Sequence, residues 1–213
     1  LIFGLIDDAF PWSPFNKLFC QSGLALALLL AFHPDVVENT SYWLVLFMYV
    51  IWIVAVVNAV NFTDVCDGLV TGLCLVSLVA VAIVRPNHAF WALALAGALV
   101  GFLVFNFPPA KIYLGDAGSH FLGYSLAIMV LPERWEDAGL AEWAFGPMAL
   151  GVFLFELVFI TKMRLNKGLK WWRGSPDHFS LRMQAAGIPK SHTIGLAWFG
   201  AIPWAGAGVI WQW

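Results

Sequence analysis

The densest group of polar side chains lies in segment 58–68, between two apolar runs. Asn58, Asn61, Asp64 and Asp67 follow at three-residue intervals, and Gly68 comes next. On a straight helix each such step turns a side chain by about 300°, so the first and last would point in opposite directions. All four can converge only if the helix ends between them, and glycine commonly ends helices. Their oxygens suit Mg²⁺, which typically takes carboxylates together with substrate phosphates. A polar helix cap is the simpler explanation for any one of them.

A second polar segment spans 106–119 and holds Asn106, Lys111 and Asp116 among prolines and glycines. The glycines on either side of Asp116 would let the backbone approach a ligand closely. The segment predicts a phosphate- or metal-binding loop, with a plain re-entrant turn as the alternative.

Two further features are ambiguous by themselves. The pair Asp7–Asp8 precedes Lys17, but acid pairs are common at membrane interfaces. Glu156 lies inside an apolar run, where a charge costs about 2.5–3.5 kcal/mol at a helix centre. A functional role and a hydrogen bond between helices explain it equally well.

The basic segment 162–192 includes His178 and Arg182 directly after Asp177. A polybasic loop beside a membrane can simply contact anionic lipid. Its histidine and arginine, in a chain with two acidic clusters, favour phosphate binding.

The elements that position these residues must be membrane helices. The chain is 61% hydrophobic and 11% charged, with a mean hydropathy of +0.81, whereas a soluble domain carries about 25% charged residues. A formal net charge of −2 offers no basis for a nucleic-acid partner. A helix needs about 20 residues to cross the hydrocarbon core. We predict an all-α polytopic transmembrane bundle, forming one catalytic domain over 1–213, with seven spans at 18–33, 42–60, 69–84, 89–105, 119–131, 143–161 and 193–213, of which 119–131 is short.

Charge predicts the orientation of the bundle. Seven alternating spans place loops 1–17, 61–68, 106–118 and 162–192 on one side, with nine of the eleven Lys and Arg residues. The opposite loops, 34–41, 85–88 and 132–142, hold two. Cytoplasmic loops collect Lys and Arg, so the polar segments are predicted to face the cytoplasm.

These segments, in this order, resemble the polyprenyl-phosphate N-acetylhexosamine-1-phosphate transferase family, which includes phospho-MurNAc-pentapeptide transferase. Asp7–Asp8 is similar to its acidic-pair motif, with Lys17 and Gln21 at the expected distance. Segment 58–68 resembles its Asn-Asn-Asp-Asp signature, 106–119 its Gly-Asp-Gly-Ser loop, and Asp177–His178 the start of its histidine motif. Leu181 stands where the family has a later histidine, a departure that argues against a MurNAc-pentapeptide substrate.

The resemblance implies attack of a polyprenyl phosphate oxygen on the β-phosphorus of a UDP-sugar, releasing UMP, as the first membrane step of cell-envelope polysaccharide synthesis in the bacterial inner membrane. It implies Mg²⁺, with Mn²⁺ as a substitute, on Asp116 with Asp64 or Asp67. Asp8 would orient or deprotonate the lipid phosphate. The implied catalytic set is Asp7, Asp8, Asp64, Asp67 and Asp116, and the implied substrate contacts are Lys17, Asn58, Asn61, Asn106, Lys111, His178 and Arg182.

The resemblance also implies about three further spans before residue 1, giving about ten in all. A homodimer is left open. The alternative from another class is a transporter of an ion or anionic solute, which would place polar groups near mid-membrane. A CDP-alcohol phosphotransferase is disfavoured because its acid-Gly-Arg signature is absent.

Overall fold

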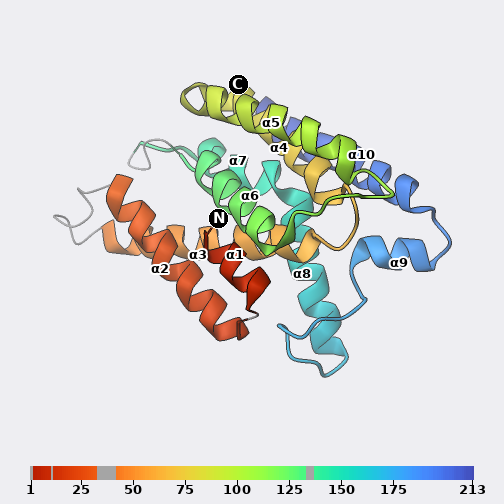
Figure 1. Ribbon diagram of the computed structural model, residues 1–213. Coiled ribbons are helices and arrows are strands. Elements are labelled where there is room, and N and C mark those ends of the chain that lie inside the picture. Colours follow the sequence, from red (N-terminus) through yellow and green to blue (C-terminus); the bar gives the residue numbers. More distant parts are fainter. Residues whose placement is uncertain (1, 11, 33–41, 133–136) are drawn as a thin grey trace.

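The computed structural model describes residues 2–10, 12–32, 42–132 and 137–213, and within them it is helical, with no strand. Figure 1 shows α4, α5 and α10 lying side by side along one edge, and α1 packs against α6. The helices are α1 (Ile2–Ala9), α2 (Pro14–Phe32), α3 (Tyr42–Thr63), α4 (Leu69–Val84), α5 (Pro86–Asn106), α6 (Gly115–Met129), α7 (Leu140–Ala149), α8 (Gly151–Asn166), α9 (Phe179–Ala185) and α10 (Lys190–Ile210).

The predicted polytopic helical bundle is confirmed, because helices cover most of each predicted span within the described residues. Four helices in the described residues, α2, α3, α5 and α10, are long and apolar enough to cross a membrane, and the bent pair α7–α8 makes up to five. The seven predicted spans are more than this, because two of them correspond to helices that are short for a membrane span: α4 has 16 residues and α6 has 15. The predicted loop 34–41 and residues 133–136 of loop 132–142 lie outside the described residues.

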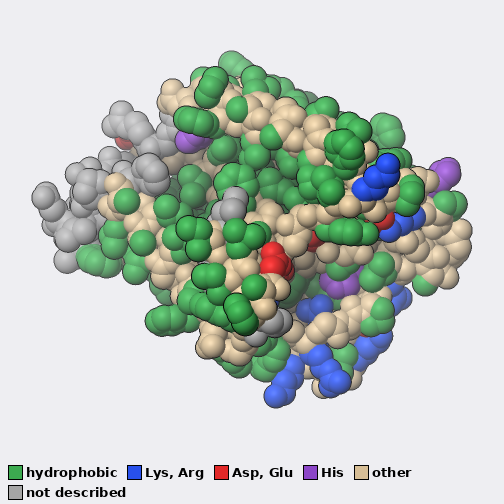
Figure 2. Space-filling view, viewed as in Figure 1, with side chains coloured by type: hydrophobic (Ala, Val, Ile, Leu, Met, Phe, Trp, Pro, Cys, Tyr) green, Lys and Arg blue, Asp and Glu red, His purple; other side chains and the backbone are tan. Residues whose placement is uncertain are grey.

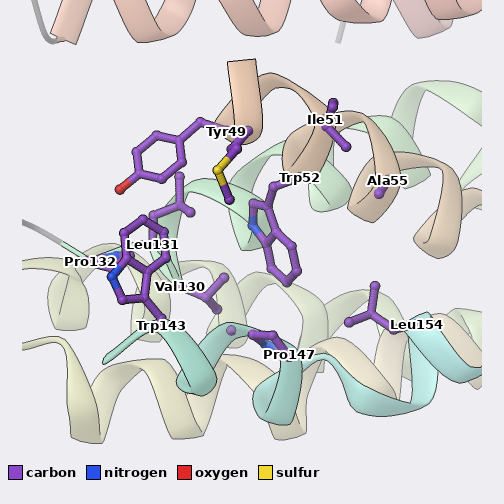
Figure 3. A pocket seen from close by; sticks show the side chains of 12 residues that line it. Tyr49, Ile51, Trp52, Ala55, Val130, Leu131, Pro132, Trp143, Pro147 and Leu154 are labelled. Carbon is purple, nitrogen blue, oxygen red and sulfur yellow. The ribbon is translucent and has the colours of Figure 1, made fainter. Parts of the chain in front are cut away.

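The predicted single span 143–161 is wrong in one respect, because α7 and α8 meet at an angle of 67°. Pro147 lies inside α7 and cannot donate a backbone hydrogen bond, which weakens the helix just before the break. The bend borders an apolar groove of about 400 Å³ against α3. Figure 3 shows Trp52 reaching from α3 toward Pro147 across this groove.

The core runs along α3 and α4. Ile53, Val57, Leu69 and Leu78 are at most 1% exposed, so one face of the short helix α4 is buried against its neighbours. Large apolar side chains on α5 and α10 instead point outward, as expected of helices that face lipid. Examples are Phe90, Trp91, Val104, Phe199 and Trp204.

Two segments predicted as loops are partly helical, because segment 1–17 contains α1 and segment 162–192 contains α9. The predicted helix break in segment 58–68 is confirmed. Helix α3 ends at Thr63, and α4 begins after Gly68, whose φ of +73° is a conformation that glycine adopts readily. Residues 64–68, here called the 64–68 turn, therefore connect the ends of two helices.

Candidate active site

One ammonium group joins three helix ends. Lys17, in the first turn of α2, places Nζ 2.5 Å from Asp7 Oδ2 and 2.9 Å from Asp116 Oδ2. Asp7 lies in the last turn of α1 and Asp116 in the first turn of α6. The Asp7 carboxylate is fully buried, whereas Lys17 and Asp116 are partly exposed. The structure therefore brings these three predicted site residues together.

Helix α3 adds a fourth element to this cluster. Asn61 Nδ2 donates to Asp116 Oδ1 over 2.8 Å and contacts Ser119 Oγ at 3.0 Å. Burial tends to raise the pKa of Asp116, but its side-chain hydrogen bonds with Asp7, Lys17 and Asn61 outweigh that effect and lower the pKa to about 2. Asp116 is therefore ionised at neutral pH and held from two sides.

Asp8 supports the start of α6. Its Oδ1 accepts from the Asp116 backbone N–H at 2.8 Å and its Oδ2 from the Ala117 N–H at 3.1 Å. A carboxylate is favourable at a helix N-terminus, where backbone donors lack partners. Helix α1 approaches closely at Gly4, where a Cβ atom would lie 2.3 Å from Ala117 Cα. The geometry gives Asp8 a capping role, and its predicted action on a lipid phosphate stays a prediction.

The other two predicted metal ligands differ in their surroundings. Burial, together with the charges of Asp116 and Asp67, raises the pKa of Asp64 to about 7. Asp67 Oδ2 instead accepts from Lys190 Nζ at 2.6 Å and from the Ala110 N–H at 3.2 Å. Burial alone would raise the pKa of Asp67, but these hydrogen bonds outweigh it and lower the pKa.

Across the described part of the chain, no three His, Cys, Asp or Glu side chains form a ready metal site. Asp67 is already paired with Lys190.

A buried chain of side chains behind Asp116 was not predicted. Asn58 Nδ2 donates to Gln21 Oε1 at 2.7 Å, and Gln21 Nε2 lies 2.9 Å from His120 Nε2. His120 Nδ1 in turn lies 2.5 Å from the Asp116 carbonyl oxygen. Asn58 was predicted to contact substrate, but its amide also donates to the Val54 carbonyl, so both its N–H groups are used inside the protein. The sequence feature that could have predicted this chain is His120, a histidine in an apolar run. It follows Asp116 by four residues and so lies on the same helix face.

Asn106 also has a positioning role in the structure. Its Oδ1 accepts from the Gly68 N–H and from Thr71 Oγ1, and its Nδ2 donates to the Ile112 carbonyl. It thereby ties the 64–68 turn to the loop after α5. Lys111, on that loop, has an exposed side chain.

The basic segment adjoins the 64–68 turn through two contacts. One is Lys190 with Asp67, and the other is Gln184 Nε2 with Cys66 Sγ at 3.4 Å. Nearby, the guanidinium of Arg164 lies 5.0 Å from the centre of the Phe62 ring. Figure 2 shows acidic side chains near the centre of the molecular face and basic side chains gathered below them, over the end of α8 and the loop that follows.

His178 and Arg182, predicted to act together on a phosphate, bind different carboxylates. Arg182 Nη1 lies 3.5 Å from Asp177 Oδ1, which Lys167 Nζ also contacts at 2.6 Å. His178 Nδ1 lies 2.6 Å from Glu156 Oε1 on α8. Of the two sequence hypotheses for Glu156, the hydrogen bond between helical segments is therefore present.

Comparison with known proteins identifies the family to which this sequence is similar. The family model for glycosyl transferase family 4 matches residues 1–132, which contain the clusters around Asp7, Asp64 and Asp116. The chain is 32% identical over 212 residues to a probable undecaprenyl-phosphate N-acetylglucosaminyl 1-phosphate transferase of Bacillus subtilis (strain 168), covering 92% of this chain and 58% of the relative.

Two phospho-N-acetylmuramoyl-pentapeptide-transferases are also similar. That of Limosilactobacillus reuteri (strain DSM 20016) is 36% identical over 140 residues, covering 58% of this chain and 43% of the relative. That of Moorella thermoacetica is 33% identical over 166 residues, covering 74% and 49%. The chain thus spans 58% or less of these relatives' lengths. The family-model match over residues 1–132, together with 32% identity over 92% of the chain, shows that the chain belongs to glycosyl transferase family 4.

Proposed function

We propose that this chain belongs to an enzyme that transfers a sugar 1-phosphate, N-acetylhexosamine 1-phosphate, from a UDP-sugar to polyprenyl phosphate and releases UMP. The observation that carries the proposal is the meeting of Lys17, Asp7, Asp116 and Asn61 at four helix ends. The names of the relatives support a transferase rather than the transporter alternative.

The chemistry needs little base catalysis. A phosphate monoester has a second pKa near 6, so most of the attacking lipid phosphate is already ionised at neutral pH. The work of the site is to align two anionic phosphates and to stabilise their charge during transfer. Lys17, Lys111 and Arg182 supply positive charge for this, and Asn61 helps to hold Asp116 in position. Lys17 also holds Asp116 in position.

The donor set around Asp116 fits a divalent cation. Burial and, after it, the charges of Asp116 and Asp67 raise the pKa of Asp64 to about 7, so a cation beside these carboxylates would favour the ionised form of Asp64. Each carboxylate oxygen has about two acceptor sites, so the bonds from Lys17 and Asn61 leave capacity on Asp116. Asp116 and Asp64 would hold Mg²⁺, with Mn²⁺ as a substitute. When bound, the ion neutralises phosphate charge. Asp67 is left out of this set because it binds Lys190.

Removal of divalent ions tests this assignment. Membranes containing the full-length protein, undecaprenyl phosphate and UDP-GlcNAc are expected to lose nearly all UMP release in EDTA and to recover it with excess Mg²⁺ or Mn²⁺. EDTA premixed with a molar excess of Mg²⁺ is the control for non-specific effects. Full turnover under complete chelation would contradict a metal on Asp116 and Asp64.

We further propose that the site faces the cytoplasm of a bacterial cell, because the loops around it carry nine of the eleven Lys and Arg residues. In a variant without native cysteines, Gly174→Cys is expected to react with an impermeant maleimide only after permeabilisation. Asn87→Cys, an exposed position on the opposite side, is expected to react in intact cells. The reverse pattern would overturn the orientation.

A further inference from the structure

Glu156 is an acidic side chain enclosed within an apolar helix. It is 1% exposed in α8, and Phe153 and Ile160, on the same helix, are equally buried. A carboxylate in such a place is costly unless specific partners satisfy it. Both oxygens of Glu156 are committed to the start of α9. Oε1 lies 2.6 Å from His178 Nδ1, and Oε2 accepts from the Phe179 backbone N–H at 3.3 Å.

This contact determines how the imidazole of His178 can act. A carboxylate can only accept, so Nδ1 must carry the hydrogen, and the ring is fixed in that tautomer. Nε2 is then the nitrogen left for a ligand. An ionised Glu156 also stabilises the imidazolium, whose Nε2–H donates to an anion. The positive charge of Arg164 interacts favourably with the Glu156 carboxylate. The neighbouring Asp177 carboxylate forms ion pairs with Lys167 and Arg182, which compensate its negative charge.

The ring belongs to the part of the chain that adjoins the active site. Helix α9, which starts directly after His178, reaches the 64–68 turn through Gln184 and Cys66. The next helix reaches the same turn through Lys190 and Asp67. An imidazole held firmly at the start of α9 therefore has a fixed position relative to the acidic cluster.

We propose that Glu156 is a positioning residue that holds His178 through Nδ1–H, so that Nε2–H of the imidazolium donates to a phosphate oxygen of the nucleotide sugar. The identity of the ligand rests on the proposed function, whereas the fixed tautomer does not. A purely structural role, in which the pair only fastens α8 to α9, would leave the affinity for UDP-GlcNAc unchanged in the second experiment below.

The first experiment observes the tautomer without substrate. In full-length protein labelled with ¹⁵N-histidine, the His178 resonances, identified by their loss in His178→Gln, are expected to show a protonated Nδ1. Glu156→Leu is expected to abolish this preference. Glu156→Gln, which keeps one acceptor oxygen, is expected to retain part of it and covers the case in which the leucine variant does not fold. An unchanged His178 signal in both variants would overturn the proposal.

The second experiment measures UDP-GlcNAc affinity by calorimetry. Glu156→Gln and His178→Ala are each expected to weaken binding, by roughly ten- to a hundredfold for the histidine. The double variant is expected to bind no more weakly than His178→Ala alone, because Glu156 acts through the ring. Phe153→Leu, a buried substitution on the same helix, controls for loss of packing and should leave the affinity close to that of the wild type.

Additive losses, or normal affinity in Glu156→Gln, would overturn the positioning role. If the wild-type protein bound no UDP-GlcNAc, the proposed function and the ligand named here would both fall. The tautomer measurement would still decide whether Glu156 positions the ring.

Discussion

Replacing Asp116 by Asn is expected to remove nearly all turnover while the protein still folds. The carboxylate accepts from Lys17 on one oxygen and from Asn61 on the other. An amide of the same shape has one acceptor, so its NH₂ group would face one of these donors. It would also remove the negative charge proposed to bind the metal. Loss of one such electrostatic group costs about 10²–10³ in kcat.

The measurement is the initial rate of UMP release, with thermal unfolding as the check on folding. Asp137→Asn, an exposed aspartate outside the cluster, is the matched control and should keep its rate within about twofold. If Asp116→Asn kept more than about a tenth of wild-type turnover, Asp116 would not have the central role proposed here.

Lys17→Met is expected to produce the largest loss of stability. Its ammonium lies 2.5 Å from Asp7 Oδ2, and the Asp7 side chain is fully buried. Removing one partner of a buried ion pair leaves a charge without compensation, at a cost of about 3 kcal/mol. For a domain of this size the melting temperature should fall by about 6–12 °C. Turnover should also fall, because Asp116 loses the same ammonium.

A second change separates the charge effect from lost packing. Asp7→Asn in the Lys17→Met background removes the stranded charge and is expected to restore most of the melting temperature, without restoring turnover. Lys162→Met, which removes an exposed lysine, should melt like the wild type. If Lys17→Met melted normally, or if Asp7→Asn gave no recovery, the ion pair would not stabilise the fold as described.

The residues that gather at the site were largely visible in the sequence, because chemical type and local spacing mark them. The three-residue steps from Asn58 to Asp67 required a helix break, and α3 does end at Thr63. Apolar runs likewise marked every long helix. Such signals are local, so the sequence carries them without knowledge of the packing.

The division of roles among these residues could not be predicted, because it depends on contacts between distant segments. Lys17 meets Asp116 across 99 positions, and nothing near Asp8 in the sequence shows that it caps α6. The pairing of Glu156 with His178 also depends on how α9 folds back onto α8. The 67° bend was missed for the same reason, since the hydropathy of segment 143–161 is continuous across it.

The position of the β-phosphate after reaction tests the central proposal most directly. Full-length protein in membranes would receive undecaprenyl phosphate and UDP-GlcNAc labelled with ³²P at the β-phosphorus, and both lipid and nucleotide products would be separated. Transfer of a sugar 1-phosphate predicts that the label enters the lipid fraction while unlabelled UMP is released in equal amount. Label recovered in released UDP, with a lipid product that carries sugar but no ³²P, would contradict it and show transfer of the sugar alone.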